Sequence, residues 1–594
     1  LRRAALRVGV TVAARAHATG AAGTPGAAPR PPRRWLVRPA PDRAAVATLE
    51  AELRLPPALC ALLAVRGLGA PDDAKRWLRP SLAQVREPGT LPGMADAVAR
   101  LSRAIDVGEL VLVHGDYDVD GICATTLMVS VLRELGGRAT PFIPHRLTDG
   151  YDLGPAGVAA AQAAGARLVL TCDCGTSASA PIATLAAAGI DVIVSDHHLP
   201  GGPLPDCVAV LNPKHPAASD ADPDLVAVGV ALQLARALCR ARGADDRKAM
   251  RHLDLVALAT IADVGALRGD NRALVRHGLD WMTRSRRAGL QALLRSSGLA
   301  GTPLSAGRVA FTLAPRLNAA GRLDAAMRGV ELLLETDESR ADVMARGLEA
   351  LNVRRQALDR ATLDEARTQA ERRVAEGARG LVLYGAWHAG VVGIVASRIV
   401  EEFGRPAVLV AMEGDTGKGS GRSIGAFDLH GALGECRDLL QRFGGHRAAA
   451  GVTVSRAQLS DFARRFDEVA RSRLSDDDLV PELKADLELP LSAVSLDLAR
   501  LLRHGEPWGV ANPTPVFVTR GATLAAAPRI LKGEHLKATL RDGAVSVEAI
   551  GFRLAAQAPG LVAGLPVDIA YQVELDTWNG AERLQLKLVD IRPA

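Results

Sequence analysis

Short apolar runs alternate with longer amphipathic stretches between residues 109 and 242. Polar residues close each apolar run, and the amphipathic stretches repeat their apolar positions at helical spacing. We expect strands at 109–116, 167–173, 191–198 and 208–213. We expect helices at 122–135, 178–189 and 226–242. This alternation is typical of an α/β domain with a doubly wound, mostly parallel sheet.

A long polar helix is predicted next, over residues 337–377. The stretch contains no Pro, and Gly347 is its only Gly before the end. Its apolar residues recur at helical spacing among many charges, which indicates a largely solvated helix that joins two domains. These apolar residues are Val343, Leu348, Leu351, Leu358 and Leu363. A self-associating coiled coil is disfavoured because the heptads are broken.

Two further folding patterns follow this helix. Residues 379–455 predict a smaller α/β unit with strands around 380–385 and 407–412, a helix from Val391 to Phe403, and a Gly-rich segment. After an acidic linker at 474–489, the apolar period changes to two, which predicts a small antiparallel barrel, with an OB-fold as the best candidate. Its strands are expected at 514–519, 535–542, 545–552, 566–575 and 582–591.

Composition excludes several classes of protein. A chain of 594 residues with 48% hydrophobic residues can build several cores, so it is not a disordered protein. Seven scattered cysteines, an odd number, argue against a disulfide framework and for a reducing compartment. No apolar run is long enough to cross a bilayer, since Gln162 and Arg167 interrupt the best stretch, so no membrane partner is expected.

Residues 1–32 differ from the rest of the chain. They are rich in Ala, Arg, Gly and Pro and carry five arginines and no acid, so the net charge of +6 leaves the remainder almost neutral. The composition fits either a transit peptide or a disordered or artefactual N-terminal extension, and we favour the second interpretation. A phosphate-binding surface in the remainder therefore requires local clustering of basic residues.

Acids and histidines follow three of the predicted strands. The first strand leads into His114, Asp116, Asp118 and Asp120, the second into Asp173, and the third into Asp196, His197 and His198. Side chains just beyond the carboxyl ends of neighbouring parallel strands converge in one crevice. So many carboxylates would repel one another without cations, and oxygen ligands mixed with imidazole suit Mn²⁺ or Mg²⁺.

Two simpler interpretations compete with a metal centre. A single Asp after a strand is commonly a turn former or a helix cap. The D-x-D-x-D spacing could also belong to a calcium loop, but the twelfth position from Asp116 is Leu127 rather than Glu. Three such clusters after three consecutive strands favour the metal centre.

The motifs that carry these residues resemble a known enzyme family. HGDYDVDG (114–121), DCGTS (173–177), SDHH (195–198) and ATIADVGAL (259–267) are similar to the four motifs of the DHH phosphoesterase superfamily. GGHRAAAG (444–451) resembles the signature of the accessory DHHA1 domain. With APRLNAAGR (314–322), HAGVVGIVASR (388–398) and EPWGVANPTPVF (506–517), the set resembles the RecJ family of single-strand-specific 5′→3′ exonucleases over residues 33–594.

The resemblance implies a domain order and a set of metal ligands. It implies a DHH catalytic domain at 33–335, a connecting helix at 336–377, a DHHA1 domain at 378–473 and an OB-fold at 474–594. The implied cofactor is a pair of Mn²⁺ ions, with Mg²⁺ as the alternative. The implied ligands are Asp118, Asp120, Asp173, His197 and Asp263, with His114 and Asp116 competing for one further position and Asp196 as a weak ligand or an orienting partner. Asp173 stands where the family has its bridging carboxylate, and His198 could donate to the phosphoryl oxygen.

Phosphate recognition is expected away from the metals. Within GSGRS (419–423), glycines would let the backbone approach a phosphate, and Ser420 and Arg422 would supply a hydroxyl and a guanidinium. A tight turn between strands is the alternative interpretation. The resemblance adds five residues to this predicted nucleic-acid site: Arg146, Arg316, Asn318, Gly445 and His446.

The function implied by the resemblance is degradation of single-stranded DNA from a 5′ end to mononucleotides, in DNA repair and recombination. The implied setting is a cytoplasmic monomer that works with a single-strand-binding protein and a helicase. Two alternatives stay open: a DHH–DHHA1 phosphodiesterase acting on oligonucleotides or cyclic dinucleotides, and a non-catalytic DNA-binding relative. The predicted barrel argues against the first, and the intact metal motifs argue against the second.

Overall fold

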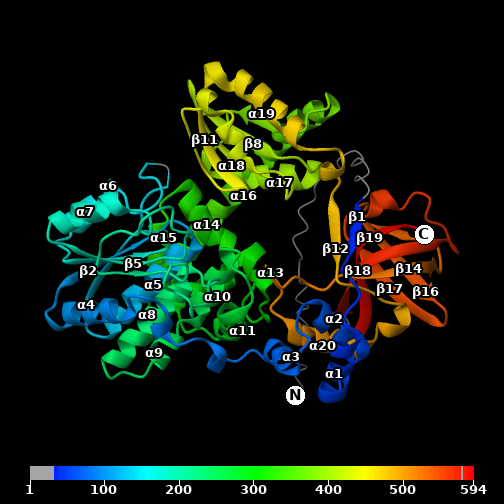
Figure 1. Cartoon of the computed structure of the whole chain (residues 1–594), viewed down its shortest axis with the longest axis horizontal. Helices are drawn as coiled ribbons and strands as arrows, with labels where there is room; N and C mark the ends of the chain where they lie inside the picture. The colour runs from blue at the N-terminus through cyan, green and yellow to red at the C-terminus, as the bar shows by residue number, and fades with distance from the viewer. Residues whose placement is uncertain (1–32, 147, 577–579) are drawn as a thin grey trace, which may run out of the picture. The chain divides into compact units, whose positions relative to one another are not determined.

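The computed structural model describes residues 33–146, 148–576 and 580–594. The predicted extension 1–32 lies outside the described residues. The chain divides into two compact units (Figure 1). The larger comprises residues 33–487 and 495–515, and the smaller comprises residues 488–494 and 516–594. Residues 474–487 and 495–515, which the resemblance assigns to the OB-fold, belong by their contacts to the larger unit.

The first sheet of the larger unit is parallel throughout, as the sequence predicts. Its strands are β2 (Leu110–Gly115), β3 (Arg138–Phe142), β4 (Leu168–Cys172), β5 (Asp191–Ser195) and β6 (Ala209–Leu211). They lie in the order β3-β2-β4-β5-β6, so the direction of winding reverses between β2 and β4. Ligands of doubly wound sheets bind at this reversal, outside the carboxyl ends of the strands.

Helices cover both faces of this sheet because its strands are apolar on both sides. Val111 and Val113 of β2 point into one core and Leu112 points into the other. The first face is covered by α4 (Met94–Asp106), α5 (Val119–Glu134), α8 (Ala227–Ala241) and α10 (Leu253–Ala262). The second face is covered by α6 (Pro155–Ala163) and α7 (Ser179–Ala187). Further helices of this region are α9 (Arg247–Met250), α11 (Gly269–Thr283), α12 (Ala288–Ser296), α13 (Ala306–Arg308), α14 (Ala314–Leu323) and α15 (Met327–Leu334).

The predicted connecting helix is α16 (Glu338–Ala375), and Figure 1 shows it leading from the first sheet domain to the second. Its buried stripe differs from the predicted one. Of the five apolar residues named above only Leu348 is buried, and Val343 is 61% exposed. The stripe consists instead mostly of alanines and of three polar residues, Asn352, Asp359 and Thr362, because α12, α14 and α17 (Ala389–Phe403) pack closely on it.

The second sheet lies beyond α16 and has the order β10-β11-β9-β8-β7. Its strands are β7 (Leu381–Gly385), β8 (Ala407–Glu413), β9 (Thr416–Arg422), β10 (Arg442–Gly445) and β11 (Ala449–Ser455). Helix α17 (Ala389–Phe403) packs on one face together with α16. Helices α18 (Leu429–Gly434) and α19 (Leu459–Arg473) pack on the other.

The Gly-rich segment is a strand rather than a tight turn, and its backbone is occupied by pairing on both sides. It is β9, the central strand, and it is hydrogen-bonded to β8 on one side and β11 on the other. A side chain at Gly419 would lie 2.7 Å from Val452, and one at Gly421 would lie 2.9 Å from Leu429. The glycines therefore make room for the core, and only side chains of β9 can contact a ligand.

The acidic linker contains a strand that the sequence pattern did not predict. Strand β12 (Glu482–Ala485) pairs in parallel with β1 (Arg34–Val37), and Figure 1 shows the two side by side. Three helices follow β1 in the sequence: α1 (Arg43–Leu53), α2 (Pro57–Val65) and α3 (Pro71–Leu78). Helix α20 (Leu496–Leu502) follows β12. Arg66 binds Asp486 through two hydrogen bonds of 3.0 and 2.9 Å, which ties the N-terminal helices to the segment after β12.

The smaller unit is a closed barrel of five main strands. They are β14 (Phe517–Leu524), β16 (His535–Asp542), β17 (Val545–Gly551), β18 (Pro566–Asp576) and β19 (Arg583–Pro593), joined by the short β13 (Leu487–Glu488) and β15 (Arg529–Leu531) at its edges. The β14–β16 pairing closes the ring, and β17 and β19 pair in parallel. The predicted OB-fold is confirmed, with its first strand three residues later than expected.

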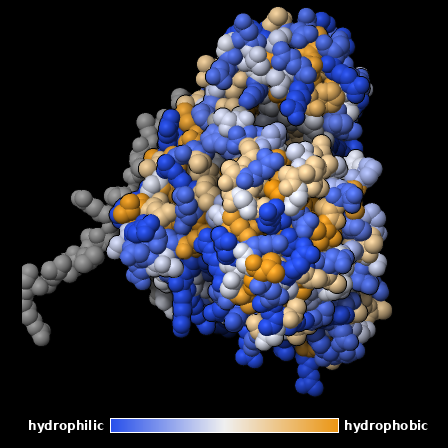
Figure 2. Space-filling view, turned by 90° about the vertical axis from the view of Figure 1, so that its left-hand side faces the viewer, coloured by the Kyte–Doolittle hydropathy of each residue, from blue (hydrophilic) through white to orange (hydrophobic). Residues whose placement is uncertain are grey.

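No helix of the described residues is both long and apolar enough to cross a membrane. The face drawn in Figure 2 is mainly hydrophilic, with hydrophobic residues scattered among the charged ones.

Candidate metal centre

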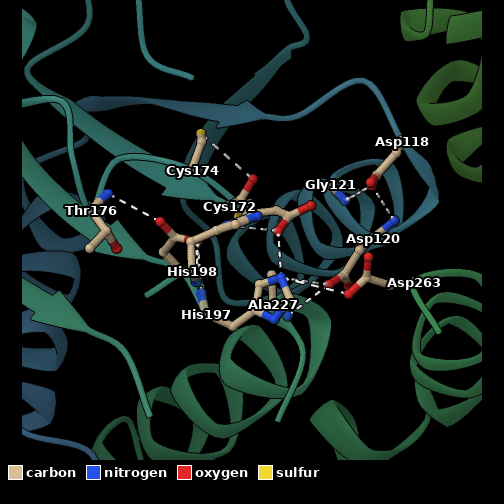
Figure 3. A network of polar contacts seen from close by, with 12 residues as sticks. Asp118, Asp120, Gly121, Cys172, Cys174, Thr176, His197, His198, Ala227 and Asp263 are labelled. Atoms are coloured by element: carbon tan, nitrogen blue, oxygen red, sulfur yellow. Dashed lines mark hydrogen bonds and ion pairs between the residues drawn. The ribbon is translucent and has the colours of Figure 1, made fainter. Parts of the chain in front are cut away.

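The acids after β2 are fixed by the start of α5. Asp118 is the N-cap of this helix and accepts hydrogen bonds from the backbone N–H groups of Asp120 and Gly121 at 2.8 and 3.2 Å (Figure 3). Asp120 accepts from the N–H groups of Ala227 and Val228 at 2.8 and 2.9 Å, at the N-terminus of α8. The positive end of that helix stabilises the Asp120 carboxylate at a position where it is fully buried.

The acid after β4 lies at the reversal point of the sheet. Asp173 has a φ of +70°, a left-handed conformation that is uncommon for any residue except Gly, Asn and Asp. Its N–H donates to the Ser195 carbonyl at 3.0 Å, which holds it between β4 and β5. The strained backbone turns the Asp173 side chain toward the acids that follow β2.

His197 joins these acids into one centre. Its Nε2 lies 3.2 Å from Asp173 Oδ1, 3.7 Å from Asp263 Oδ2 and 4.0 Å from Asp120 Oδ2 (Figure 3). Three groups of residues bring one ligand atom each within 4.8 Å of one another. They are Asp173 with His197 and His198, Asp120 with His197 and Asp263, and Asp116 with Asp118 and Asp173. Since Asp173 and His197 each belong to two groups, the three groups form a continuous centre.

The electrostatics of the centre call for cations. Burial, together with the neighbouring carboxylates, raises the pKa values of Asp116, Asp120 and Asp173 well above the usual range. The same causes raise the pKa of Asp263 to about 7. Asp116 Oδ1 and Asp173 Oδ1 are buried without a hydrogen-bond donor among the described residues. Unsatisfied buried oxygens beside imidazole nitrogen fit Mn²⁺ or Mg²⁺.

Asp196 does not belong to any of the three groups. Its Oδ1 accepts from His198 Nδ1 at 2.7 Å and from the His197 and His198 N–H groups, and its Oδ2 accepts from Thr176 N–H at 3.1 Å. Burial alone would raise the pKa of Asp196, but the bond from His198 holds that pKa well below its usual value. Although burial opposes it, the same bond raises the pKa of His198. Asp196 therefore orients His198, whose ring nitrogens also lie 3.1 Å from the Tyr151 hydroxyl.

His114 also lies outside the three groups. It is fully buried on the α6 face of the sheet, where its ring packs on Phe142 and its Nδ1 lies 3.5 Å from Cys174 Sγ. Burial lowers the pKa of His114 to about 4, so the ring is neutral. Between the two competing positions the geometry favours Asp116, because only Asp116 is grouped with other candidate ligands.

Four arginines gather near these acids, and the sequence identified two of them, Arg146 and Arg422. The pKa of Arg322 falls to about 10 because it is buried and because Arg146, Arg355 and Arg422 are close. Arg322 donates to the Gly390 carbonyl at 3.1 Å, at the start of α17. Arg146 lies over the Tyr117 ring at 4.6 Å. We call Arg146, Arg322, Arg355 and Arg422 the arginine cluster.

Two glycines place helix α14 between the acids and the second sheet. A side chain at Gly321 would lie 2.3 Å from the Tyr117 carbonyl oxygen, and one at Gly390 would lie 2.5 Å from the Arg322 carbonyl oxygen. Helix α14 can therefore touch both the loop of Asp116 and Asp118 and the N-terminus of α17. This packing is why Arg322, the last arginine of APRLNAAGR, reaches the arginine cluster.

The remaining predicted phosphate residues fall into two sets. Ser420 accepts from Arg422 Nη1 at 3.1 Å and faces Gly393 of α17, so it joins the arginine cluster. Arg316 instead pairs with Glu349 of α16 and donates to the Thr312 carbonyl. Asn318 is half-buried and makes no side-chain hydrogen bond among the described residues.

Gly445 and His446 lie in the β10–β11 hairpin. Gly445 has a φ of +139°, and a side chain there would collide with the Ala449 carbonyl oxygen at 2.5 Å. His446 is exposed, and its N–H donates to the Ala449 carbonyl. The backbone of the hairpin requires a glycine at position 445, and the exposed imidazole of His446 is accessible to a ligand.

Comparison with known proteins supplies the family. Profiles of the DHH family N-terminal domain, the DHHA1 domain and the RecJ OB domain match residues 110–260, 377–472 and 485–590. The chain is 37% identical to the single-stranded-DNA-specific exonuclease RecJ of Salmonella typhimurium, over 93% of this chain and 98% of that protein. It is 35% identical to the Escherichia coli RecJ, over 92% and 97%. The chain belongs to the RecJ family.

Solved RecJ structures share the whole architecture. RecJ of Thermus thermophilus in complex with Mn²⁺ matches with a TM-score of 0.81 and 34% identity, over 94% of this chain and 80% of that one. The same protein in complex with Mg²⁺ matches with a TM-score of 0.75 and 33% identity, over 94% and 78%. The order of DHH domain, connecting helix, DHHA1 domain and OB-fold is therefore that of RecJ, and the predicted cofactors are the ions that RecJ binds.

Proposed function

We propose that this member of the RecJ family is a metal-dependent 5′→3′ exonuclease that degrades single-stranded DNA to mononucleotides in DNA repair and recombination. The observation that carries the proposal is the pairing of a carboxylate centre with an arginine cluster across α14. The first can hold divalent cations and the second can hold phosphate. Relatives named single-stranded-DNA-specific exonucleases support the choice of substrate.

The metal centre has enough ligands for two cations. Asp116, Asp118, Asp120, Asp173, His197 and Asp263 are the ligands of the proposal, with Asp173 shared because it belongs to two ligand groups. When bound, a pair of Mn²⁺ or Mg²⁺ ions would supply an activated water and neutralise charge on the attacked phosphoryl group. His114 is not a ligand in this proposal.

The protein side chains position the substrate. Asp196 orients His198 and raises its pKa against the opposing effect of burial, so its ring is placed to donate a hydrogen bond to a phosphoryl oxygen. The arginine cluster and Ser420 hold a terminal 5′-phosphate, because guanidinium forks match phosphate oxygens. Arg355 Nε is buried without a partner among the described residues, which fits a donor that waits for an anion. His446 contacts the strand near the scissile bond.

The decisive experiment uses one oligonucleotide labelled at either end. With Mn²⁺, the protein should release labelled mononucleotide at once from the 5′-labelled strand and only late from the 3′-labelled strand. The Asp173→Asn variant is the matched control, because Asn tolerates the left-handed backbone at this position. Release from the 3′ label first would contradict the polarity.

The alternative enzyme class can be tested in the same assay. A phosphodiesterase for oligonucleotides or cyclic dinucleotides would hydrolyse a cyclic dinucleotide, which has no 5′ end for the arginine cluster to bind. The proposed exonuclease leaves it intact. The closed barrel, which matches the RecJ OB domain, supports the exonuclease.

The proposal extends to the setting of the enzyme. Seven free cysteines, six of them buried, fit a reducing cytoplasm. A monomer that works with a single-strand-binding protein and a helicase fits an exonuclease that needs exposed single strands. Light scattering of the purified chain, alone and with single-strand-binding protein, tests both the monomer and the first partner.

A further inference from the structure

A basic cavity lies in the larger unit, apart from the residues of the proposed active site. It has a volume of about 250 Å³ and is lined by Arg276, Arg500, Arg503, His504 and Glu506. Arg276 comes from α11, Arg500 from α20, and the others from the turn that follows α20. None of the lining residues is Trp, Tyr or Phe, so the cavity offers mainly charge and hydrogen-bond donors.

A buried arginine fixes the wall of this cavity. Arg272 Nη2 donates to the carbonyl oxygens of Gly505 and Glu506 at 2.9 and 3.2 Å. The same guanidinium donates to the Trp77 carbonyl and lies 4.7 Å from the centre of the Trp77 ring. Within the described residues Arg272 has no carboxylate partner, so its charge adds to the potential of the cavity. Burial and the nearby Arg276 lower the pKa of Arg272 to about 10.

The charges that line the cavity are not balanced. Arg500 pairs with Asp497 at 3.3 Å. Arg276, Arg503 and His504 form no ion pair within the part of the chain that the structure describes, and Glu506 is the one acid of the lining. Arg276 is nonetheless half-buried. Arg503 and His504 are exposed, so the argument from burial applies to Arg276 alone: a half-buried cation without a counter-ion is costly unless an anion binds beside it.

We propose that this cavity binds a phosphate group of the substrate strand, on the 3′ side of the nucleotide being cleaved. The inference rests on the proposed function. Guanidinium forks suit the sugar–phosphate backbone and read no base, as expected for an exonuclease that accepts any sequence. Helix α11 begins six residues after the metal ligand Asp263, and Arg276 lies about 10 Å along its axis. In the proposal, a strand whose end lies at the metals reaches the cavity a few nucleotides along.

The test compares short and long strands in a double variant, Arg276→Ala with Arg503→Ala. We expect KM for a 5′-phosphorylated strand of about 20 nucleotides to rise several-fold, while kinetics on a strand of about 4 nucleotides stay unchanged. The slope of log Kd against log salt should fall by about 0.7 for each phosphate that the variant no longer binds. Arg503→Lys, which keeps the charge, should restore part of the affinity.

The matched control is Arg247→Ala, an arginine whose side chain is 88% exposed on α9. It should change neither the salt slope nor KM. An unchanged slope in the double variant would overturn the proposal. The proposal would also be overturned if the double variant lost affinity for an Asp- and Glu-rich peptide while its salt slope for DNA stayed intact. That result would assign the cavity to an acidic protein segment. Failure of the proposed function is distinguishable, because the wild-type protein would then not cleave the short strand.

Discussion

The carboxylate centre and the arginine cluster are two regions that each gather charges of one sign. They differ in how the charges are held. The carboxylates stand on short side chains that backbone N–H groups fix, as at Asp118 and Asp120. The arginines reach in on long side chains from a loop, two helices and a strand. The first region is built by one sheet, whereas the second exists only after two sheet domains have packed against α14.

This difference predicts different responses to substitution. A carboxylate fixed by the backbone stays in place when a neighbour is removed, so loss of one ligand should remove chemistry without disturbing the fold. The arginines carry like charge and, in the proposed function, share one phosphate ligand. Loss of one should weaken binding while the chemistry remains.

The largest expected effect is that of Asp173→Asn. Because Asp173 belongs to two ligand groups, the variant should lose at least about 10²-fold in kcat with saturating Mn²⁺. The metal-free variant should melt at a higher temperature than the metal-free wild type, since one of several mutually repelling buried carboxylates is gone. Initial rates and thermal melts with a chelator measure both. Activity above a tenth of wild type would remove Asp173 from the centre.

Arg322→Ala should have the next largest effect, and on binding rather than chemistry. We expect KM for a 5′-phosphorylated strand to rise by about 10-fold or more with kcat nearly kept, because the interaction is shared by ground and transition states. A 5′-hydroxyl strand should be affected less. Arg316→Ala is the matched comparison, since Arg316 pairs with Glu349. A larger effect at Arg316 would show that this ion pair opens to take the phosphate.

Gly321→Ala tests whether α14 holds the two regions together. The added methyl group would meet the Tyr117 carbonyl oxygen, so α14 must move away from the loop of Asp116 and Asp118. We expect a loss of about 1–3 kcal/mol of stability and a several-fold loss of kcat/KM. Gly347→Ala on α16 is the control, because nothing lies within 4 Å of the new methyl group. It should stabilise the helix by about 0.5–1 kcal/mol. If the two variants changed stability and kcat/KM equally, α14 would not be the element that holds the two regions together.

The smallest expected effect is a pH dependence of stability. The pKa of Asp263 is raised from 3.8 to about 7, so in the metal-free protein the unfolded chain ionises first. Folding therefore costs progressively more as the pH rises from about 3.8 to about 7, and Asp263→Asn lacks this cost. The variant should gain melting temperature relative to wild type between about pH 5 and pH 8, measured with a chelator present. If the difference in melting temperature between Asp263→Asn and wild type did not change with pH, the pKa of Asp263 would lie near its ordinary value.

The sequence predicted the carboxylate centre better than the arginine cluster, and the two modes of construction explain this. Asp116, Asp173 and His197 follow strands, and parallel strand ends meet at one edge of a sheet. Arg322 and Arg355 carry no such signal, because they are helical residues whose position depends on the packing of α14 and α16. The one available clue for Arg322 was the pair of small residues, Ala320 and Gly321, just before it.

Other differences have equally local causes. His114 competed with Asp116 for one ligand position, and the alternation of β2 turns His114 to the α6 face. The glycines of β9 resembled a phosphate loop, whereas they relieve crowding against Val452 and Leu429. Strand β12 could not be predicted from its acidic stretch, because its partner β1 lies near the opposite end of the larger unit in the sequence.

The pairing of β1 with β12 has a consequence for how the chain is made. Arg34 binds Glu482 across 448 residues of sequence, so β1 has no partner until nearly the whole larger unit has been synthesised. At typical rates of translation this takes roughly 20–90 s, during which the edge of β1 is open to other chains. Arg34 and the proline-rich residues after Val37 are the kind of sequence that keeps such an edge from pairing wrongly. The newborn protein is thus most exposed to misassembly at β1.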